Sequence, residues 1–310
     1  MSEPSIAAGG TEPATALPNL RLFSGPEFKL LLVALIWGFD FVAQRQGVLG
    51  SGPFFFNAAS FGLGALILGV RRRLSPSELP IAPARRAGIL TGLVLFGAMS
   101  FQSAGLAHTG AGKAAFITCL YIVLVPLAMH LSGVRGGRWA WIGCGFSLMG
   151  LWFLCVQPGF TLAPGDLLVL ACSVFWTAHI LLVGRFAASV DQDALSFWQF
   201  ATCTALSLGC SLGFESVGIG QVRDSLLPIL YNGVLSAGVA YSLQISGQGG
   251  TSSSRAALIL SLETVFAGLG GWFFLHERFG AREALGSLLM LAGVLASRLG
   301  KPVLETRALE

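Results

Sequence analysis

The sequence predicts an all-α polytopic membrane protein in which ten transmembrane helices form two inverted five-helix repeats. Three observations predict this fold class. The composition is apolar and poor in charge, the apolar residues fall into ten segments of membrane-spanning length, and the two halves carry matched residue types at a nearly constant offset.

The composition excludes most classes of soluble protein. Of the 310 residues, 54% are hydrophobic and 11% are charged, whereas a soluble domain carries about 25% charged residues. So few charges cannot cover a water-exposed surface, which indicates a chain solvated by lipid. The net charge of +4 is too small and too scattered to suggest a nucleic-acid partner. The six cysteines lie in apolar runs, so we interpret them as core residues and expect neither disulfides nor a metal site.

Ten stretches of the chain are suited to cross a bilayer, which takes about 20 apolar residues per helix. In order they are 27–48, 54–70, 85–106, 111–132, 138–157, 164–186, 193–213, 224–245, 252–274 and 281–299. The second is short and the eighth carries several polar groups, which makes these two the weakest. The connections are short and contain turn pairs such as Gly52-Pro53 and Pro158-Gly159.

Lysine and arginine set the expected orientation, because they concentrate on the cytoplasmic side. With both termini in the cytoplasm, 14 of the 19 basic residues fall on that side, and the triple Arg71–Arg73 decides the bias. Arg278 and Arg282 oppose it, although Glu277 and Glu283 lie among them. Residues 1–26 are polar and rich in Pro, Ala and Gly, so we expect a disordered cytoplasmic tail there and a second cytoplasmic tail over 301–310.

The two halves, 27–160 and 161–300, match at a nearly constant offset. Lys113-Ala-Ala corresponds to Arg255-Ala-Ala at an offset of 142. Further matches are Gln102 with Gln244, Asn57 with Gln199, Trp37 with Trp176, Gly143 with Gly286 and Gly150 with Gly293. Because each half has five spans, an odd number, the second half enters the membrane from the opposite side. Inverted repeats are typical of secondary transporters, which bind substrate near the membrane midplane between the repeats.

Three motifs follow one another along the spans: ALIWGFDFVAQ at 34–44, AGKAAFITCLYIVLVP at 111–126, and LILSLETVFA at 258–267 leading to His276-Glu277-Arg278. In this order they resemble the bacterial EamA branch of the drug/metabolite transporter superfamily, over about 27–300. The resemblance implies ten helices in two inverted repeats and the transport of small metabolites across the plasma membrane, which is the bacterial inner membrane. Two departures concern helix kinks and gating. Ile122 and Thr264 stand where relatives often carry Pro, and Gly133-Val134-Arg135 replaces a Gly-Glu-Arg motif.

Asp40 and Glu263 are the acidic residues expected deep in the spans, where an ionisable group costs about 2.5–3.5 kcal/mol. Each has two interpretations. Asp40 binds a proton or a substrate amine, or it pairs with Arg45 or a neighbouring helix. Glu263 serves the same function, or it makes a packing hydrogen bond near the pseudo-two-fold axis. Tyr121 corresponds to Glu263 in the first repeat and is expected to offer its hydroxyl to the same cavity.

Lys113 and Arg255 begin the fourth and ninth spans from opposite sides. We interpret them as gating or substrate-anion contacts at the two mouths, or alternatively as side chains that reach lipid head groups. Gln102 and Gln244 are expected to face each other across a central polar space, with interhelical hydrogen bonding as the structural alternative. Weaker polar candidates are Asn57, His179, Gln199, Asn232 and Tyr241, and the expected aromatic lining is Trp37, Phe41 and Trp176.

No nucleophile motif, phosphate-binding loop, metal-ligand spacing or dinucleotide fingerprint occurs in the sequence. We therefore expect no catalytic residue and no cofactor. The prediction is a secondary transporter, with export as the expected direction, for small polar or amphipathic metabolites such as amino acids, by alternating access at a cavity between the repeats. The alternatives are an intramembrane enzyme and a non-transporting sensor or channel. The expected partners are a small-molecule substrate and membrane lipid, together with protons if Asp40 or Glu263 couples transport; exchange without coupling is equally consistent.

Overall fold

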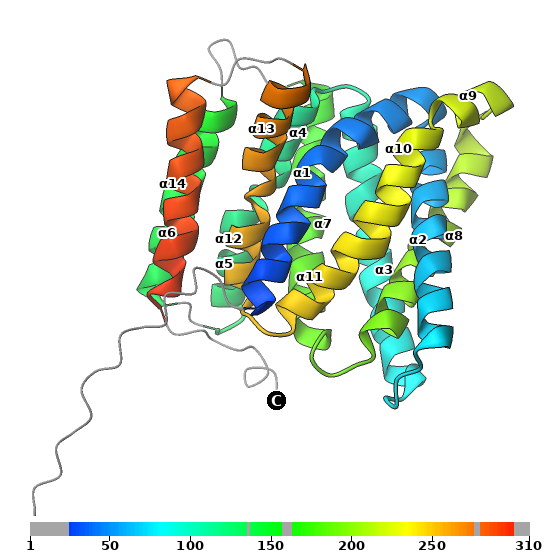
Figure 1. Ribbon diagram of the computed structural model, residues 1–310, viewed down its shortest axis with the longest axis horizontal. Helices are drawn as coiled ribbons and strands as arrows, with labels where there is room; N and C mark the ends of the chain where they lie inside the picture. The colour runs from blue at the N-terminus through cyan, green and yellow to red at the C-terminus, as the bar shows by residue number, and fades with distance from the viewer. Residues whose placement is uncertain (1–24, 135–136, 157–162, 276–279, 301–310) are drawn as a thin grey trace, which may run out of the picture.

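The computed structural model describes residues 25–134, 137–156, 163–275 and 280–300, and all regular secondary structure in these residues is helical (Figure 1). Five helical stretches are each long and apolar enough to cross a membrane: Pro53–Leu74, Ile81–Leu106, Ala111–Leu131, Pro164–Phe186 and Leu226–Gln248. The chain is therefore an all-α polytopic membrane protein, as the sequence predicts. The predicted tails beyond these residues, Pro158-Gly159, Arg135 and His276-Glu277-Arg278 lie outside the described residues.

The first half forms the five helical stretches expected of it. They are α1 (Gly25–Ser51), α2 (Pro53–Leu74), α3 (Ile81–Leu106), α4 with α5 (Ala111–Thr118 and Tyr121–Leu131) and α6 (Arg138–Cys155). The turn between α1 and α2 follows from two residues. Gly52 adopts a φ of 88°, and Pro53 begins the next helix, where its missing N–H costs nothing. The backbone N–H groups of Phe54 and Phe55 donate to the Glu215 carboxylate at 2.9 and 2.8 Å.

The second half repeats this pattern with one addition. Its stretches are α7 (Pro164–Phe186), α8 (Gln192–Phe214), α10 with η1 and α11 (Leu226–Leu230, Tyr231–Ala240 and Tyr241–Gln248), α12 with α13 (Ser253–Leu260 and Glu263–Leu275) and α14 (Ala281–Arg298). The short helix α9 (Ile219–Asp224) lies in the connection before α10. The segment η1 is a π-helix, a form that is rare and occurs mainly at functional sites.

The fourth and ninth spans are both interrupted at equivalent places, at residues 119–120 and 261–262. In the fourth span, Pro126 has no N–H to offer the Ile122 carbonyl, which instead accepts from Cys144 Sγ at 3.6 Å. In the ninth span, the Thr264 hydroxyl donates to the Ser261 carbonyl at 2.8 Å. Such local hydroxyl bonds compete with the helical ones.

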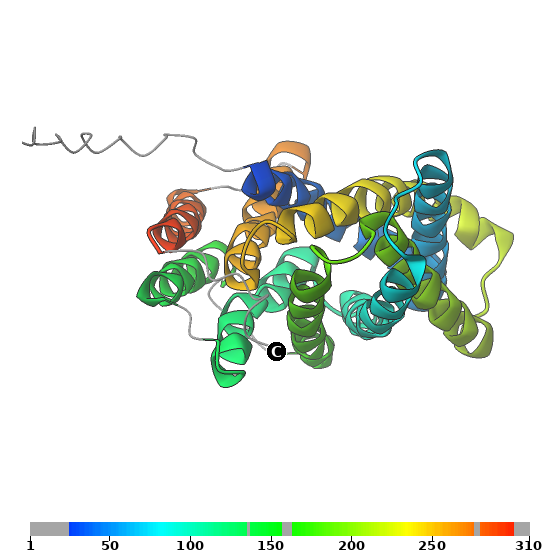
Figure 2. The same cartoon turned by 90° about the horizontal axis from the view of Figure 1, so that it is seen from below.

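The two halves run in opposite directions through the bundle. In Figure 1, α1 begins at the lower end and α7 begins at the upper end, and the following stretches alternate. The outermost helices at each edge of the bundle are counterparts in the two halves, namely α6 with α14 and α2 with α8 (Figure 2). This is the arrangement that an inverted repeat requires.

Glycines bring α6 and α14 into backbone contact. A Cβ on Gly143 would lie 2.6 Å from the Gly293 carbonyl, and a Cβ on Gly150 would lie 2.5 Å from the Gly286 carbonyl. Gly143 corresponds to Gly286 and Gly150 to Gly293, so exchanging the two halves turns one contact into the other. Close approach through small residues is the usual packing mode of membrane helices.

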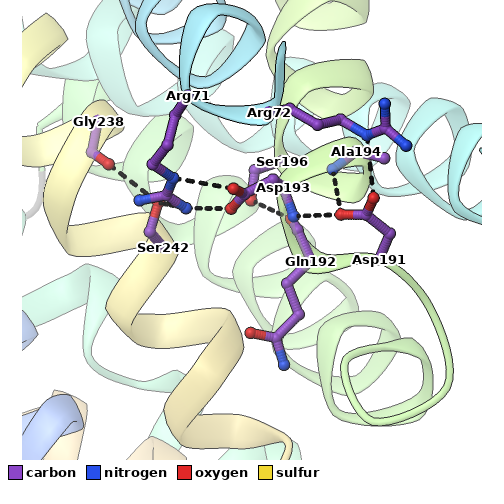
Figure 3. Close-up of polar contacts among 9 residues, drawn as sticks. All are labelled: Arg71, Arg72, Asp191, Gln192, Asp193, Ala194, Ser196, Gly238 and Ser242. Carbon is purple, nitrogen blue, oxygen red and sulfur yellow. Dashed lines mark hydrogen bonds and ion pairs between the residues drawn. The ribbon is translucent and has the colours of Figure 1, made fainter. Parts of the chain in front are cut away.

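Ion pairs join α2 to α8 at the lower end of the bundle (Figure 3). Arg71 makes a two-pronged ion pair with Asp193, and Arg72 Nε lies 2.9 Å from Asp191 Oδ2. Asp191 also caps α8 by accepting from the backbone N–H of Asp193 and Ala194. The arginines that dominate the predicted charge bias are therefore anchored to the neighbouring helix at this end.

Large apolar side chains occur both inside the bundle and on its outer surface. Phe56, Phe61 and Phe200 are fully buried between helices, whereas Leu212 and Phe214 are about four-fifths exposed. Lipid tails solvate such side chains as well as a protein core does, which explains why both placements are stable.

Candidate functional site

A narrow cavity lies at the centre of the bundle, and both halves contribute to its walls. The first half supplies Trp37, Asp40, Phe41, Gln44, Phe61, Met99, Gln102, Thr118 and Tyr121, and the second supplies Trp176, Ile180, Asn232, Ser236, Tyr241, Leu260 and Glu263. Its volume is about 30 Å³, room for roughly two water molecules. The structure is therefore a closed conformation, because a metabolite would need a wider space.

Helix α1 presents one face to this cavity. Trp37, Asp40, Phe41 and Gln44 follow the i, i+3, i+4, i+7 spacing that places side chains on one side of a helix. Gly38 lies on another face, where a Cβ would approach the Glu263 carbonyl to 2.7 Å. The missing side chain lets α1 touch α13 and brings the two predicted acidic residues to the same cavity.

Asp40 is held by a neighbouring helix and not by Arg45. Asn232 Nδ2, from η1, donates to Asp40 Oδ2 at 2.7 Å. Arg45 Nε instead donates to the Thr109 carbonyl at 3.1 Å. Asp40 is 8% exposed, and its Oδ1 atom is buried without a hydrogen-bond partner in the part of the chain that the structure describes.

Glu263 lies at the break between α12 and α13 and contacts its counterpart in the first repeat. The Tyr121 hydroxyl donates to Glu263 Oε1 at 3.2 Å, and Cys119 Sγ approaches the same oxygen at 3.3 Å. Cys119 Sγ also lies 3.9 Å from the Ser261 carbonyl. The two helix breaks therefore meet near the pseudo-two-fold axis, and Tyr121 and Glu263 both line the cavity.

The two predicted glutamines differ in their surroundings. Gln102 lines the cavity: its Nε2 donates to Gln44 Oε1 at 2.8 Å, and its Oε1 accepts from Trp176 Nε1 at 2.7 Å. Gln244 is fully buried but is not among the residues that line the cavity. The first repeat therefore provides the amide that reaches the central space.

Three other predicted polar residues lie away from the cavity lining, in contacts between helices. Asn57 Nδ2 donates to the Met99 carbonyl at 3.2 Å and its Oδ1 accepts from the Ser103 hydroxyl at 2.9 Å. His179 Nε2 and Gln199 Oε1 lie 3.1 Å apart. These bonds join α2 to α3 and α7 to α8, which corresponds to the structural alternative.

The predicted aromatic residues Trp37, Phe41 and Trp176 all form part of the cavity wall. The Trp37 ring lies 5.6 Å from the Trp176 ring and 4.9 Å from the Tyr241 ring, between centroids. Trp37 and Trp176 correspond in the two repeats, so each repeat contributes one indole. Phe41 and Phe61 complete this wall.

An ion pair between the two halves lies at the upper end of the bundle. Lys113 Nζ lies 2.5 Å from Asp166 Oδ2, and the Thr109 hydroxyl donates to Asp166 Oδ1 at 2.7 Å. Asp166 also accepts from the Ala163 N–H, which caps α7. Lys113 therefore ties the start of α4 to the start of α7.

A second ion pair between the halves lies at the lower end. Arg255 Nη1 lies 3.5 Å from Glu27 Oε1, and Arg298 Nη2 lies 3.3 Å from Glu27 Oε2. The offset that relates Trp37 to Trp176 also relates Glu27 to Asp166. Exchange of the two repeats therefore converts the Lys113–Asp166 pair into the Arg255–Glu27 pair, so equivalent contacts join the halves at the two ends of the bundle.

The sequence reasoning overlooked several residues of the site. Gln44, Thr118 and Ser236 line the cavity and were not singled out. Gln44 could have been found from its helical spacing to Trp37 and Asp40. Asp166 and Glu27, which the sequence places at the starts of spans, could have been found by applying the repeat offset to acidic residues as well as to basic ones. In the described residues no group of three His, Cys, Asp or Glu side chains is arranged to hold a metal ion.

Comparisons with known proteins show what the chain is similar to. The chain is 32% identical over 279 residues to an uncharacterized transporter of Archaeoglobus fulgidus, covering 89% of this chain and 85% of that protein. It is 24% identical to the uncharacterized transporter YoaV of Bacillus subtilis, covering 86% and 94%. The threonine/homoserine exporter RhtA of Salmonella typhimurium is 28% identical over 185 residues, covering 56% and 59%.

A crystal structure that is 22% identical in sequence superposes with a TM-score of 0.73 and covers 88% of this chain and 96% of its own, which supports the fold. The EamA-like transporter family matches twice, over residues 26–156 and 163–299. The family and these relatives are transporters, which excludes the intramembrane enzyme considered above. The protein belongs to the EamA-like transporter family, within the drug/metabolite transporter superfamily, and is a multi-pass membrane transporter for small molecules.

Proposed function

We propose that this transporter exports small polar or amphipathic metabolites, such as amino acids, by alternating access at the central cavity. One observation supports the proposal: the two halves line one cavity, and equivalent ion pairs join them at the two ends of the bundle, where we place the mouths of that cavity. Opening one pair while keeping the other would expose the cavity to one side of the membrane at a time.

The contacts of Lys113 and Arg255 support their interpretation as gates. Both side chains bind acidic residues that are almost fully buried, with side-chain exposures of 0% for Asp166 and 3% for Glu27. A side chain that only reached lipid head groups would not need such a partner. Export and an amino-acid class of substrate are favoured by the likeness to RhtA, which is named as a threonine/homoserine exporter.

The orientation completes the proposal. We place the lower end of Figure 1 in the cytoplasm of a bacterial cell, with both termini on that side and the protein in the inner membrane, because Arg71–Arg73 and Arg85–Arg86 belong to helix ends at that end. A membrane-impermeant thiol reagent added to intact cells should label a cysteine at His108 but not one at Arg73, in a background that lacks the six native cysteines. Labelling at position 73 would reverse the orientation.

The experiment that tests alternating access locks one mouth at a time. Metabolites that accumulate in the medium of cells overproducing the protein identify the cargo, and its efflux is then measured from loaded proteoliposomes. Lys113→Cys with Asp166→Cys, or Glu27→Cys with Arg255→Cys, is bridged by a short bis-methanethiosulfonate reagent, which forms a disulfide with each thiol. Each bridge should stop efflux, and a reducing agent should restore it.

Two controls limit the interpretation of the bridged variants. The same reagent on Gly218→Cys with Gln221→Cys, which both belong to the second half and lie away from the cavity lining, should leave most of the efflux intact. Single-cysteine variants account for modification without bridging. Efflux that continues with either mouth bridged would contradict alternating access through this cavity.

A further inference from the structure

We propose that the central cavity recognises a small primary amine in its protonated form, with Asp40 as the counter-ion and with an oxygen acceptor on the same molecule bound by Trp37 or Gln44. The inference rests on the proposed function, because it names the class of substrate that the same cavity would take. Four buried polar atoms and the charge of the cavity wall lead to it.

The lining of the cavity carries acidic side chains without basic ones. Asp40 and Glu263 are present, whereas Lys, Arg and His are absent from the lining residues in the described part of the chain. Nearby bases bind elsewhere: Arg45 donates to the Thr109 carbonyl, and Lys113 pairs with Asp166. In a low-polarity interior such a wall attracts a cation and repels an anion more strongly than it would in water.

Two buried hydrogen-bond acceptors in the cavity wall, on Asp40 and Asn232, have no donor among the described residues. Asn232 donates its Nδ2 group to Asp40 Oδ2, which leaves the amide oxygen Oδ1 as an acceptor. Asn232 Oδ1 and Asp40 Oδ1 are both buried without a partner among the described residues. An ammonium group carries three N–H donors, so it can satisfy both atoms at once.

Two buried hydrogen-bond donors on the same face of α1, on Trp37 and Gln44, have no acceptor among the described residues. The Trp176 indole N–H can only donate, so it fixes the oxygen of the Gln102 amide, and Gln102 Nε2 then fixes the oxygen of Gln44. Gln44 Nε2 and Trp37 Nε1 remain as buried donors without partners in the described structure. A buried polar atom without a hydrogen bond is costly, and a polar ligand in the cavity would satisfy these two acceptors and two donors together.

Helix geometry sets the size of that ligand. Trp37 precedes Asp40 by three residues and Gln44 follows it by four, which corresponds to about 4.5 and 6 Å along the helix axis. An oxygen three bonds from the amine nitrogen, as in a 2-amino alcohol, an amino amide or an amino acid, lies within reach of a donor on either side of Asp40. The rings of Trp37 and Tyr241, 4.9 Å apart, add faces that attract a cation.

Binding by the full-length protein in detergent micelles tests the proposal without requiring transport. The probes are leucinol, leucinamide and leucine, and threoninol, threoninamide and threonine. Each is paired with the compound of the same skeleton that lacks the amine. Thermal unfolding is followed against probe concentration, and ligand that binds the folded state raises the midpoint. We expect at least one amine to raise it with saturation and every amine-free partner to leave it unchanged.

Variants assign the binding to the named atoms. Asp40→Asn should weaken amine binding at least about tenfold, because a hydrogen bond to a charged group is lost. Asp40→Glu keeps the charge and should keep the preference for amines, which distinguishes a lost counter-ion from a damaged fold. Asp193→Asn removes a carboxylate from the α2–α8 ion pairs and should leave the affinity unchanged.

Three results would overturn the proposal: no amine stabilises the protein, an amine-free partner stabilises it equally, or Asp40→Asn binds the amine as the wild type does. These results are separate from the test of transport. Bridges that stop efflux while amines fail to bind would refute this inference alone. Amine binding together with bridges that have no effect would refute alternating access and leave the binding site standing.

Discussion

At the scale of single residues, the site depends on two carboxylates that the structure places differently. Asp40 shares one oxygen with Asn232 and keeps the other without a partner, whereas Glu263 accepts from the hydroxyl of its counterpart Tyr121. Neither group has a Lys or Arg partner among the hydrogen bonds and ion pairs given above. We propose that each takes up a proton when the cavity faces a more acidic solution.

Asp40→Asn and Glu263→Gln should each change the pH dependence of efflux, and not only its rate. Protonation of Asp40 removes the counter-ion of an amine, so amine binding by the wild type should weaken as the pH falls, and binding by Asp40→Asn should be weak and nearly independent of pH. The measurement is efflux and binding across a pH series on both sides of the membrane. Wild-type profiles in both variants would show that neither acid couples transport to protons.

The sequence predicts those site residues that are chemically unusual in a membrane span or that have a matched residue in the other repeat. Asp40 and Glu263 stand out because charge is expensive in a span, and Trp37 and Trp176 stand out because the repeat matches them. Gln244 carries the same signals as Gln102, yet it does not line the cavity, since only the three-dimensional path of η1 and α11 decides which residues face inward. Asn232 and Ser236 reach the cavity from that π-helix, whose altered period no helical-wheel argument would have used.

At the scale of helices, the spans are predictable and their interruptions are not. All ten predicted spans are helical within a few residues, because apolar length follows directly from bilayer thickness. The breaks at 119–120 and 261–262 carry neither Gly nor Pro. Pro126 frees the Ile122 carbonyl just after the first break, and the Ser261 and Thr264 hydroxyls bond to nearby carbonyls around the second. Both breaks lie close to Ile122 and Thr264, where the resemblance leads one to expect Pro.

The contact between α6 and α14 gives a prediction at the same scale. Gly150→Ala places a methyl group 2.5 Å from the Gly286 carbonyl, so the helices must separate. Overpacking of this kind costs about 1–3 kcal/mol, and the midpoint of thermal unfolding in detergent should fall.

Gly145→Ala on the same helix is the matched control, because its methyl group meets nothing within 4 Å. There the substitution should be neutral or slightly stabilising, since Ala is the better helix former. Equal effects at 145 and 150 would show that the glycine contact does not hold the two helices together.

At the scale of the whole molecule, the near-symmetry of the two halves accounts for how one fold could open on either side. The upper pair joins Lys113 of the first half to Asp166 of the second, and the lower pair joins Arg255 of the second half to Glu27 of the first. The surroundings of the two acidic residues, Glu27 and Asp166, differ. Glu27 holds a second base, Arg298, whereas Asp166 gains a hydroxyl and a backbone N–H. The two ion-pair sites are equivalent in position but differ in their partners. Such sites allow the conformations open at the upper and at the lower end to have similar free energies, and a carrier needs both conformations to be populated.

Opposite shifts should therefore follow from breaking the two pairs. Asp166→Asn removes the charge that holds Lys113 at the upper mouth, which should favour the conformation open at that end. Glu27→Gln should favour the conformation open at the lower end. A loss of about 1 kcal/mol in one ion pair changes the ratio of the two conformations, open at the upper or at the lower end, roughly fivefold.

The reporter is a cysteine at Thr118, which lines the cavity, in a background without native cysteines. Its labelling by an impermeant reagent added at the upper side should become faster in Asp166→Asn and slower in Glu27→Gln, and the order should reverse for reagent added at the lower side. If both substitutions shift the labelling in the same direction, the two ion pairs stabilise the fold without acting as alternating gates.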